Sequence, residues 1–189
     1  MRRVYLIRHG LTEGNRLRRY IGRTDEPLCA AGRAALSAAP LKGIETVYVS
    51  PLLRARETAA ILFPHARQIV VDGLREMDFG AFENRSADDM KNDAAYRAWV
   101  DGLCEGDCPG GENRRGFVAR TVRAFENICA AGGDAQMVIV AHGGTVMARM
   151  SERGEPKKDY WAWHVGAGGC LRCALDGGRL LYEGDGFDA

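Results

Sequence analysis

Arginine and histidine side chains follow several apolar runs of the chain at the point where each run ends. Arg8 and His9 come directly after the first run, His142 follows a later one, and Arg54 lies shortly after another that ends at Ser50. Guanidinium and imidazole groups suit the binding of an anion. Each residue alone is typical of a solvated surface, but their recurrence at strand ends predicts one anion site.

The start of the helix after Ser50 carries signals of its own. Ser50 is expected to cap this helix, and Pro51 to occupy its first position. Arg54 then lies in the first turn, where a cation is disfavoured by the helix dipole. An anion bound between Arg54 and the helix end explains this placement.

The pattern of the chain predicts how these side chains are brought together. Short apolar runs alternate with helical patterns, which is typical of βαβ units and a mostly parallel sheet. The expected strands are residues 4–7, 46–49, 69–71 and 137–140, and the expected helices are 32–41, 52–63 and 146–150. The carboxyl ends of parallel strands share one edge, and ligands of such sheets bind there.

Three further segments complete the expected fold. Residues 113–130 form one apolar stripe at helical spacing, which predicts a long helix packed on the sheet. Strand patterns at 170–175 and 179–182 flank a Gly-rich hairpin turn. Residues 76–116 are polar, contain a helical piece around 89–100, and are expected to cap one edge as an insertion.

The predicted fold class is therefore α/β. We expect three layers, with a mostly parallel central sheet, helices on both faces and an antiparallel edge hairpin. Residues 1–189 are expected to form a single domain.

Composition and charge exclude several classes of protein. The chain is 46% hydrophobic and 27% charged, which excludes a disordered or fibrous chain. The formal net charge is only +1, so we expect no nucleic acid and no membrane as partner. Arg8 interrupts the first apolar run too early for a signal peptide, and we expect a cytoplasmic protein. The pattern favours no particular oligomeric state.

The six cysteines are expected to be reduced thiols, because this number is sparse beside that of disulfide-rich domains. Cys170 and Cys173 form a CxxC pair, but a separation of three along a strand places them on opposite faces. Cys104 and Cys108 have no histidine nearby. We therefore predict no metal site and no cofactor.

The remaining histidines and the tryptophans have no comparable setting. His65 and His164 are predicted to be surface or packing residues. Trp99, Trp161 and Trp163 are predicted to pack rather than to stack on a ligand, because no basic stripe accompanies them.

Five short motifs occur in order between residue 4 and about residue 150. They are Leu6-Ile7-Arg8-His9-Gly10-x-Thr12-x-x-Asn15, Gly22-x-x-Asp25-x-x-Leu28, Ser50-x-Leu52-x-Arg54-Ala55-x-x-Thr58-Ala59, Leu74-x-Glu76-x-x-Phe79-Gly80-x-x-Glu83 and Ala141-His142-Gly143. Each motif is weak alone, but their order and spacing together are specific. In these motifs the chain resembles the histidine phosphatase superfamily, also called the phosphoglycerate mutase-like family.

The resemblance implies a phosphohistidine mechanism on His9, with Arg8, Arg54 and His142 as the phosphate pocket and Glu76 as the proton donor. A phosphomonoester dianion needs charge neutralisation, which guanidinium donors supply. The same cations disfavour a protonated imidazole, so they help to keep the nucleophile neutral.

Smaller groups around the phosphate have expected roles as well. The second ring nitrogen of His9 is expected to donate to a backbone carbonyl near Gly10 and so to fix the tautomer. The N–H of Gly143 is expected to donate to a phosphoryl oxygen. By resemblance Thr12 and Asn15 line the phosphate rim, and hydrogen bonds within their own loop are an equal alternative.

A proton donor must be protonated at the working pH, and Glu76 fits if apolar neighbours and the bound dianion raise its pKa. The same group can later deprotonate the water that attacks the phosphohistidine. Only the resemblance selects Glu76 over Asp72, Asp78 and Glu83, since a glutamate in a polar loop is normally solvated.

Three positions depart from the family pattern. Leu11 stands where Glu or Gln is usual, Cys29 where Thr is common, and Asn84 where Gly is frequent. These departures remove no charged catalytic group, and we expect them to bear on leaving-group recognition.

The resemblance favours a metal-independent phosphatase for a small phosphomonoester. The chain after His142 is short, whereas mutases of the family carry a tail over the site, so water can reach the intermediate. Residues 74–80 and 110–112 are similar to those of alpha-ribazole phosphatases, and broad-specificity sugar-phosphate phosphatases share much of this pattern. The alternatives are a phosphoglycerate mutase-type phosphotransferase and a non-catalytic module that binds a phosphorylated ligand.

Overall fold

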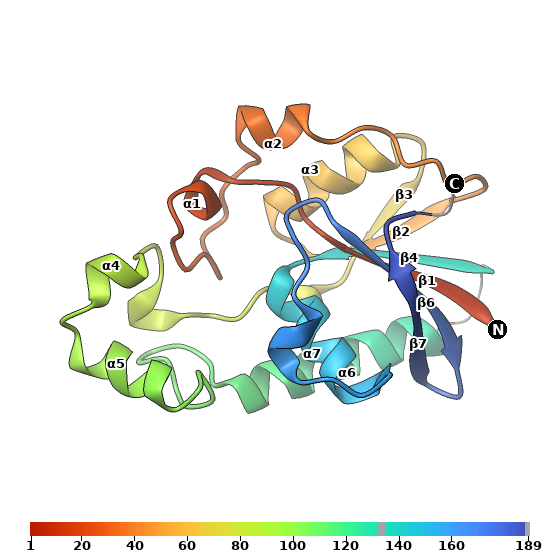
Figure 1. The fold of residues 1–189 in the computed structure, drawn as a ribbon. Coiled ribbons are helices and arrows are strands. Elements are labelled where there is room, and N and C mark those ends of the chain that lie inside the picture. Colours follow the sequence, from red (N-terminus) through yellow and green to blue (C-terminus); the bar gives the residue numbers. More distant parts are fainter. Residues whose placement is uncertain (132–134, 188–189) are drawn as a thin grey trace.

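The computed structural model describes residues 1–131 and 135–187 (Figure 1). In this part of the chain, the strands form one sheet in the order β3-β2-β4-β1-β6-β7-β5. The strands are β1 (Arg2–Arg8), β2 (Thr46–Val49), β3 (Arg67–Val70), β4 (Gln136–Ala141), β5 (Gly154–Glu155), β6 (Cys170–Asp176) and β7 (Arg179–Asp185). The first four in the sheet order are parallel, whereas β6 runs antiparallel to both β1 and β7.

The described α-helices are α1 (Glu13–Arg16), α2 (Ala30–Ala34), α3 (Leu53–Leu62), α4 (Ala87–Met90), α5 (Ala94–Asp101), α6 (Arg114–Ala130) and α7 (Gly143–Arg153). Short 3₁₀ turns are η1 (Asp72–Leu74), η2 (Gly80–Phe82) and η3 (Tyr160–Trp163). None of these helices has the length and apolar composition needed to cross a membrane.

Alternating side chains of β1 join the two faces of the sheet to different helices. Val4 and Leu6 are buried in the cluster that contains residues of α6 and α7. Tyr5 and Ile7 are buried in the cluster that contains residues of α3. Figure 1 shows α2 and α3 on one side of the sheet and α6 and α7 on the other. This arrangement confirms the three layers and the mostly parallel sheet.

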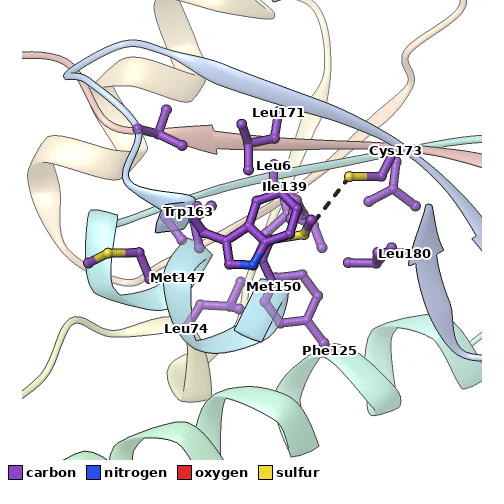
Figure 2. Packing of buried hydrophobic residues seen from close by; sticks show 14 of the residues in the cluster. Leu6, Leu74, Phe125, Ile139, Met147, Met150, Trp163, Leu171, Cys173 and Leu180 are labelled. Carbon is purple, nitrogen blue, oxygen red and sulfur yellow. Dashed lines mark hydrogen bonds between the residues drawn. The ribbon is translucent and has the colours of Figure 1, made fainter. Parts of the chain in front are cut away.

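The larger of these two clusters combines aliphatic side chains with aromatic and sulfur-containing ones (Figure 2). Trp163 and Phe125 lie around Met150, whose sulfur is 3.9 Å from the Sγ atom of Cys173. Cys170 belongs to the cluster on the other face, so the two cysteines of the CxxC pair do point to opposite faces. The packing role expected for Trp163 is confirmed.

The antiparallel hairpin is confirmed, and its turn explains the glycines. Gly177 and Gly178 have positive φ angles of 54° and 83°, which suit a tight turn between twisted strands. The hairpin is not the outermost element, however, because the short strand β5 pairs with β7 on its outer side.

The segment between β3 and α6 lies at the far left of Figure 1, away from the N-terminus, and we call residues 77–113 the cap. The helical piece expected around 89–100 is split into α4 and α5, because Asp93 caps a new helix through the backbone N–H groups of Ala95 and Tyr96. The apolar side chains of the cap pack on Phe117 of α6 and Ala148 of α7. The single-domain organisation stays a prediction.

The helix expected over residues 32–41 is wrong in extent, since α2 ends at Ala34. Pro40 disfavours helical geometry in the residue before it. That residue, Ala39, instead donates its backbone N–H to the carbonyl of Leu62 at the end of α3. The chain therefore leaves the helix to bind the neighbouring element.

The expected capping of α3 is also wrong. Its N-cap residue is Leu52, and no side chain caps it from that position, so Pro51 lies outside the helix. The N–H of Leu53 is satisfied by Oδ1 of Asp25, at 2.6 Å. Ser50 makes its short contact elsewhere, with His142. Arg54 nevertheless lies in the first turn, as expected.

Candidate active site

The parallel pairing of three strands brings the separate polar motifs to one edge. Arg8 at the end of β1 pairs with Ala141 at the end of β4, and Val49 of β2 pairs with Val140. Backbone hydrogen bonds continue this register, because the N–H of His9 donates to the carbonyl of Ala141 at 2.9 Å. The residues that follow the three strands are thereby held side by side.

His9 is buried and has one ring nitrogen committed to the backbone. Its Nδ1 lies 2.7 Å from the carbonyl oxygen of Gly10, which accepts the proton and leaves the lone pair on Nε2. The N–H of Gly10 donates to Oγ1 of Thr58 at 2.9 Å, and that hydroxyl donates to the carbonyl of Arg54 at 2.7 Å. Helix α3 thus helps to fix the ring.

Burial lowers the pKa of His9 to about 3, and the cation of Arg54 adds to this effect. The hydrogen bond to Gly10 opposes it, and Arg8 contributes less. The imidazole is therefore neutral at neutral pH, and its Nε2 can act as a nucleophile.

His142 lies against His9, with ring centroids 5.1 Å apart. Its Nε2 is 2.7 Å from Oγ of Ser50, and among the described residues its buried Nδ1 has no partner. Burial lowers the pKa of His142 well below its usual value, and the charge of Arg54 adds to this. A proton on Nδ1 is the arrangement in which this nitrogen donates to a bound anion while Ser50 donates to Nε2.

Arg54 is fully buried and is held by backbone carbonyls rather than by a carboxylate. Its Nη1 donates to the carbonyl of Thr24 at 2.7 Å, and its Nη2 donates to those of Ile21 and Gly22 at 3.2 and 2.8 Å. Its Nε–H is buried without a partner in the described part of the chain. The guanidinium therefore keeps its positive charge available for an anion.

Arg8 is anchored by the segment that follows η3. Its Nη1 donates to the carbonyl of Val165 at 2.7 Å and lies 3.3 Å from Nε2 of His164. His164 is exposed, as expected for a surface residue, but it lies at the site, which the sequence pattern did not predict. Gly143 packs against the guanidinium, since a Cβ atom there would lie 3.5 Å from Cζ of Arg8.

Glu76 is held at the N-terminus of α7. Its Oε2 accepts from the N–H of Gly144 and its Oε1 from the N–H of Met77, both at 2.9 Å. A Cβ atom at Gly144 would lie only 2.3 Å from Oε1, so a glycine is required for the carboxyl to approach. Burial raises the pKa of Glu76, although the two backbone hydrogen bonds and the arginines oppose this effect.

An ion pair between α6 and the cap fixes the backbone that carries Glu76. Arg120 of α6 binds Glu112 through two hydrogen bonds, of 2.8 and 2.6 Å. It also donates to the carbonyls of Gly73, Arg75 and Glu76 at 3.2, 2.9 and 3.2 Å. The position of the acid thus depends on α6 as well as on α7.

Thr12 and Asn15 lie at the start of α1. Oγ1 of Thr12 accepts from the backbone N–H of Asn15 at 3.2 Å, so this hydroxyl acts within its own loop. Oδ1 of Asn15 is buried and has no partner among the described residues. The roles of the two side chains at the phosphate rim stay predictions.

The three departures from the family pattern have local structural roles. Cys29 caps α2 through Sγ, which accepts from the N–H of Gly32 at 3.3 Å. The carbonyl of Leu11 accepts from the N–H of Cys29. Asn84 has a φ of 60°, a conformation that Asn tolerates better than most residues other than Gly. None of the three is among the residues around the cavity beside Glu76, so the expected link to leaving-group recognition finds no support there.

A cavity of about 250 Å³ opens beside Glu76, and we call it the aromatic cavity. Its lining includes the charged or polar side chains of Arg8, Glu76, Arg114 and His164 and the backbone of Gly143 and Gly144. Its other walls include Tyr20, Phe79, Trp99, Phe117, Met147, Tyr160 and Trp161. Trp161 is 53% exposed, so the packing role expected for it is wrong. Trp99 does pack inside the cap, and its buried indole N–H has no partner in the described part of the chain.

In the described part of the chain, neither a second groove nor a metal site is favoured as an alternative functional site. A larger groove of about 900 Å³ runs along α6, and neither Arg8 nor Glu76 nor the start of α7 lines it. Within residues 1–131 and 135–187, no three His, Cys, Asp or Glu residues are grouped so that they could hold a metal ion.

The fold and the paired imidazoles define a histidine phosphatase type of site. The family model of the histidine phosphatase superfamily (branch 1) matches residues 4–183, and the chain belongs to this superfamily. Over 151 residues the chain is 34% identical to a probable phosphoglycerate mutase GpmB of Serratia proteamaculans, and the match covers 76% of this chain and 70% of the relative.

Two solved structures share the fold. The alpha-ribazole phosphatase from Shigella flexneri superposes with a TM-score of 0.83 at 24% identity, covering 96% of this chain and 94% of that one. A phosphoglycerate mutase from Thermus thermophilus superposes with a TM-score of 0.74 at 30% identity, covering 99% of both chains. Similarity in the fold therefore extends to proteins named for both hydrolysis and phosphate transfer.

Several site residues were not assigned from the sequence. Ser50, Thr58, Gly144 and Arg120 act through contacts that join distant segments, and His164 follows no strand. Ser50 and Thr58 belong to the same sequence motif as Arg54, so their membership of that motif could have indicated a role at the site. Nothing in the local sequence pattern marks Arg120 or His164.

Proposed function

We propose that the protein is a metal-independent phosphomonoester hydrolase that works through a phosphohistidine on His9. The observation that carries this proposal is that the buried His9 ring is neutral and held in one tautomer. Its Nδ1 is tied to Gly10, its pKa is lowered to about 3, and Arg8 and Arg54 lie close enough to act on that pKa. A neutral nucleophile beside two cations suits attack on a dianionic phosphoryl group.

In the first step Nε2 of His9 forms a bond to phosphorus while the bond from phosphorus to the alcohol oxygen breaks. Glu76 donates its proton to the leaving oxygen. Arg8, Arg54 and His142 bind the phosphoryl oxygens as their negative charge is redistributed. In the second step water attacks phosphorus, Glu76 takes its proton, and His9 is released with inorganic phosphate.

The raised pKa of Glu76 supports this assignment of the acid. A protonated carboxyl is needed when the alcohol leaves, and an ionised one when water attacks, so the same group serves both steps in turn. The hydrogen bond from Gly144 holds the carboxyl at the start of α7, and His142 is the N-cap residue of the same helix. The acid and the second imidazole are therefore held by one element.

The aromatic cavity supports a leaving group that carries a flat, largely apolar ring. The partly exposed rings of Tyr20, Phe79 and Tyr160 and the exposed ring of Trp161 offer surfaces that suit an aromatic group better than a polyhydroxylated sugar. Alpha-ribazole 5'-phosphate has such a group, and an alpha-ribazole phosphatase is among the proteins that share the fold. We therefore favour this substrate class over sugar phosphates.

Phosphoglycerate mutase activity is the second candidate, because relatives carry that name. A phosphorylated acid needs further cations for its carboxylate. Beyond Arg8, the aromatic cavity is lined by Arg114, which is paired with Glu105 and lies 5.0 Å from the ring centroid of Tyr160. Because Arg114 is already paired with Glu105, the cavity offers little positive charge for a second acidic group, and this favours hydrolysis over mutase chemistry.

Turnover of p-nitrophenyl phosphate in EDTA tests the reaction class. We expect full activity in EDTA, loss of activity in His9→Ala, and unchanged activity in His65→Ala, a control histidine that is exposed after α3. Activity that persists in His9→Ala would exclude His9 as nucleophile, and sensitivity to EDTA would indicate a metal phosphatase. Phosphate binding without turnover in the wild type would favour the binding-module alternative.

The substrate class needs a separate measurement. Release of inorganic phosphate should be compared for alpha-ribazole 5'-phosphate, a set of sugar phosphates and 3-phosphoglycerate at equal concentrations. We expect the highest kcat/KM for the first. A preference for sugar phosphates would contradict the role proposed for the aromatic cavity while leaving the phosphohistidine mechanism intact.

A further inference from the structure

The loop that holds Arg54 is itself held from the cap. Residues 21–24 present carbonyl oxygens to the Arg54 guanidinium, and we call these residues the arginine loop. Because these carbonyls hold both terminal nitrogens of Arg54, the direction of the guanidinium depends on where the loop lies. What fixes the loop therefore matters for phosphate binding.

Glu83 holds the loop in place. Its Oε1 accepts from the backbone N–H groups of Gly22 and Thr24, both at 2.8 Å. These are two of the residues whose carbonyls accept from Arg54. One carboxylate oxygen and one guanidinium thus bind the same peptide segment.

The surroundings leave the loop little freedom to find another position. A Cβ atom at Gly22 would lie 1.9 Å from the carbonyl oxygen of Met77 and 3.0 Å from Oε2 of Glu83. Next to Glu83 in the chain, the N–H of Asn84 donates to the carbonyl of Tyr20 at 2.7 Å. The loop is confined between the cap backbone and the carboxylate.

The second oxygen of Glu83 makes no such contact. Oε2 is buried and, within the described residues, no donor binds it. Burying a carboxylate oxygen without a donor costs free energy. The cost of the unpaired Oε2 means that Glu83 does not stand at this position for stability alone. A requirement for one acceptor oxygen that binds two backbone N–H groups explains why a glutamate is here.

We propose that Glu83 is a positioning residue for Arg54, which acts through the arginine loop to hold the guanidinium in the orientation that binds phosphate. The inference rests on the proposed function, because it takes Arg54 as a phosphate ligand. Glu83 itself touches neither the phosphate nor the reacting atoms. Its effect is therefore expected in phosphate affinity and to vanish when Arg54 is absent.

Two conservative variants separate geometry from charge. Glu83→Gln keeps an acceptor oxygen of the same reach and removes the charge, whereas Glu83→Asp keeps the charge and shortens the reach by one methylene group. The binding of inorganic phosphate, measured by calorimetry on the whole protein, is the readout. We expect Glu83→Asp to weaken phosphate binding about tenfold, and Glu83→Gln to stay within about threefold of the wild type.

A double-variant cycle tests the route of the effect. Arg54→Ala alone should weaken phosphate binding at least about tenfold, and adding Glu83→Asp to it should cause little further loss. Glu26→Gln is the control. The charge of Glu26, like that of Glu83, opposes the lowering of the Arg54 pKa by burial, but Glu26 binds the N–H of Gly14 instead of the arginine loop. We expect this variant to leave phosphate affinity within about twofold.

The outcomes distinguish this inference from the proposed function. Unchanged affinity in Glu83→Asp, with weak binding in Arg54→Ala, would overturn the role of Glu83 and leave the phosphatase assignment standing. Equal losses from Glu83→Asp with and without Arg54 would also overturn it, because the effect would then travel by another route. A wild type that neither binds phosphate nor turns over p-nitrophenyl phosphate would overturn both.

Discussion

Burial of His9 has a consequence for stability as well as for catalysis. The imidazole is removed from water, which lowers its pKa from the ordinary 6.5 to about 3, and Arg54 contributes next. In the unfolded chain the same side chain regains its ordinary pKa. Between these two values the unfolded state binds a proton that the folded state does not bind, so stability falls as the pH is lowered.

The size of this effect can be measured by difference. From pH 7 to pH 5, His9 alone should remove about 2 kcal/mol of unfolding free energy, since each full proton contributes about 1.4 kcal/mol per pH unit. The variant His9→Asn lacks this titration. Urea unfolding of both proteins across this range should give a stability difference that shifts by about 2 kcal/mol toward the variant as the pH falls. A constant difference would mean that His9 titrates normally in the folded protein.

The loss of activity on substitution of Glu76 is expected to depend on the leaving group of the substrate. Glu76→Gln cannot donate a proton, so kcat for an alkyl phosphate should fall by about a hundredfold or more. The p-nitrophenolate ion is a weak base and leaves without a proton, so the first step with p-nitrophenyl phosphate should be much less affected. Burst kinetics for the two substrates measure this step. Equal losses for both would remove Glu76 as the general acid.

The N-terminus of α7 is the element on which the acid and the second imidazole depend. His142 is its N-cap residue, and Gly144 in the first turn binds Glu76. Alanine normally stabilises a helix relative to glycine. Here its Cβ atom would lie 2.3 Å from the carboxyl oxygen, so the acid must move.

We therefore predict opposite behaviour for two glycine substitutions in helices. Gly144→Ala should lower kcat/KM at least about tenfold, since displacement of a catalytic group by about 1 Å can cost more than this. Gly116→Ala in α6 is the matched control, because its Cβ atom would meet only the Asn113 side chain, at 3.3 Å. It should retain activity, because α6 contributes no reacting group at this position. Full activity in Gly144→Ala would contradict the position assigned to Glu76.

Elements with strong local patterns could be predicted from the sequence. The strands over 4–7, 46–49 and 137–140 and the helix over 113–130 were expected because periodicity and apolar runs are local properties. The capping of α3 was not, because Asp25 reaches Leu53 across 28 positions of the chain. The same limitation applies to α2, because the residues after it bind α3 instead of continuing the helix.

At the scale of the whole molecule, the site requires contacts between segments that are far apart in the chain. The motifs allowed His9, Arg54, His142 and Glu76 to be named together, and parallel strand order explains why the first three converge. The aromatic cavity could not be predicted, because its walls come from the loop at Tyr20, from the cap, from both α6 and α7 and from η3. No local pattern carries that arrangement.

The packing of the cap explains how these distant parts form one site. Its apolar cluster includes Phe117 of α6 and Ala148 of α7, and the ion pair of Arg120 and Glu112 joins the cap to the segment of Glu76. The cavity is therefore bounded by parts of the protein that are packed on one another. Its shape is expected to be largely formed before a ligand binds.

The most direct test of the proposed mechanism is to locate the phosphate during turnover. The wild type is mixed with a phosphomonoester, quenched within the first turnover in alkali, digested and mapped by mass spectrometry. We expect phosphate on the peptide that contains His9, bound at Nε2, stable in alkali and lost in acid. Phosphate on His142 or on any other residue, or rapid turnover with no phosphorylated peptide, would contradict the mechanism.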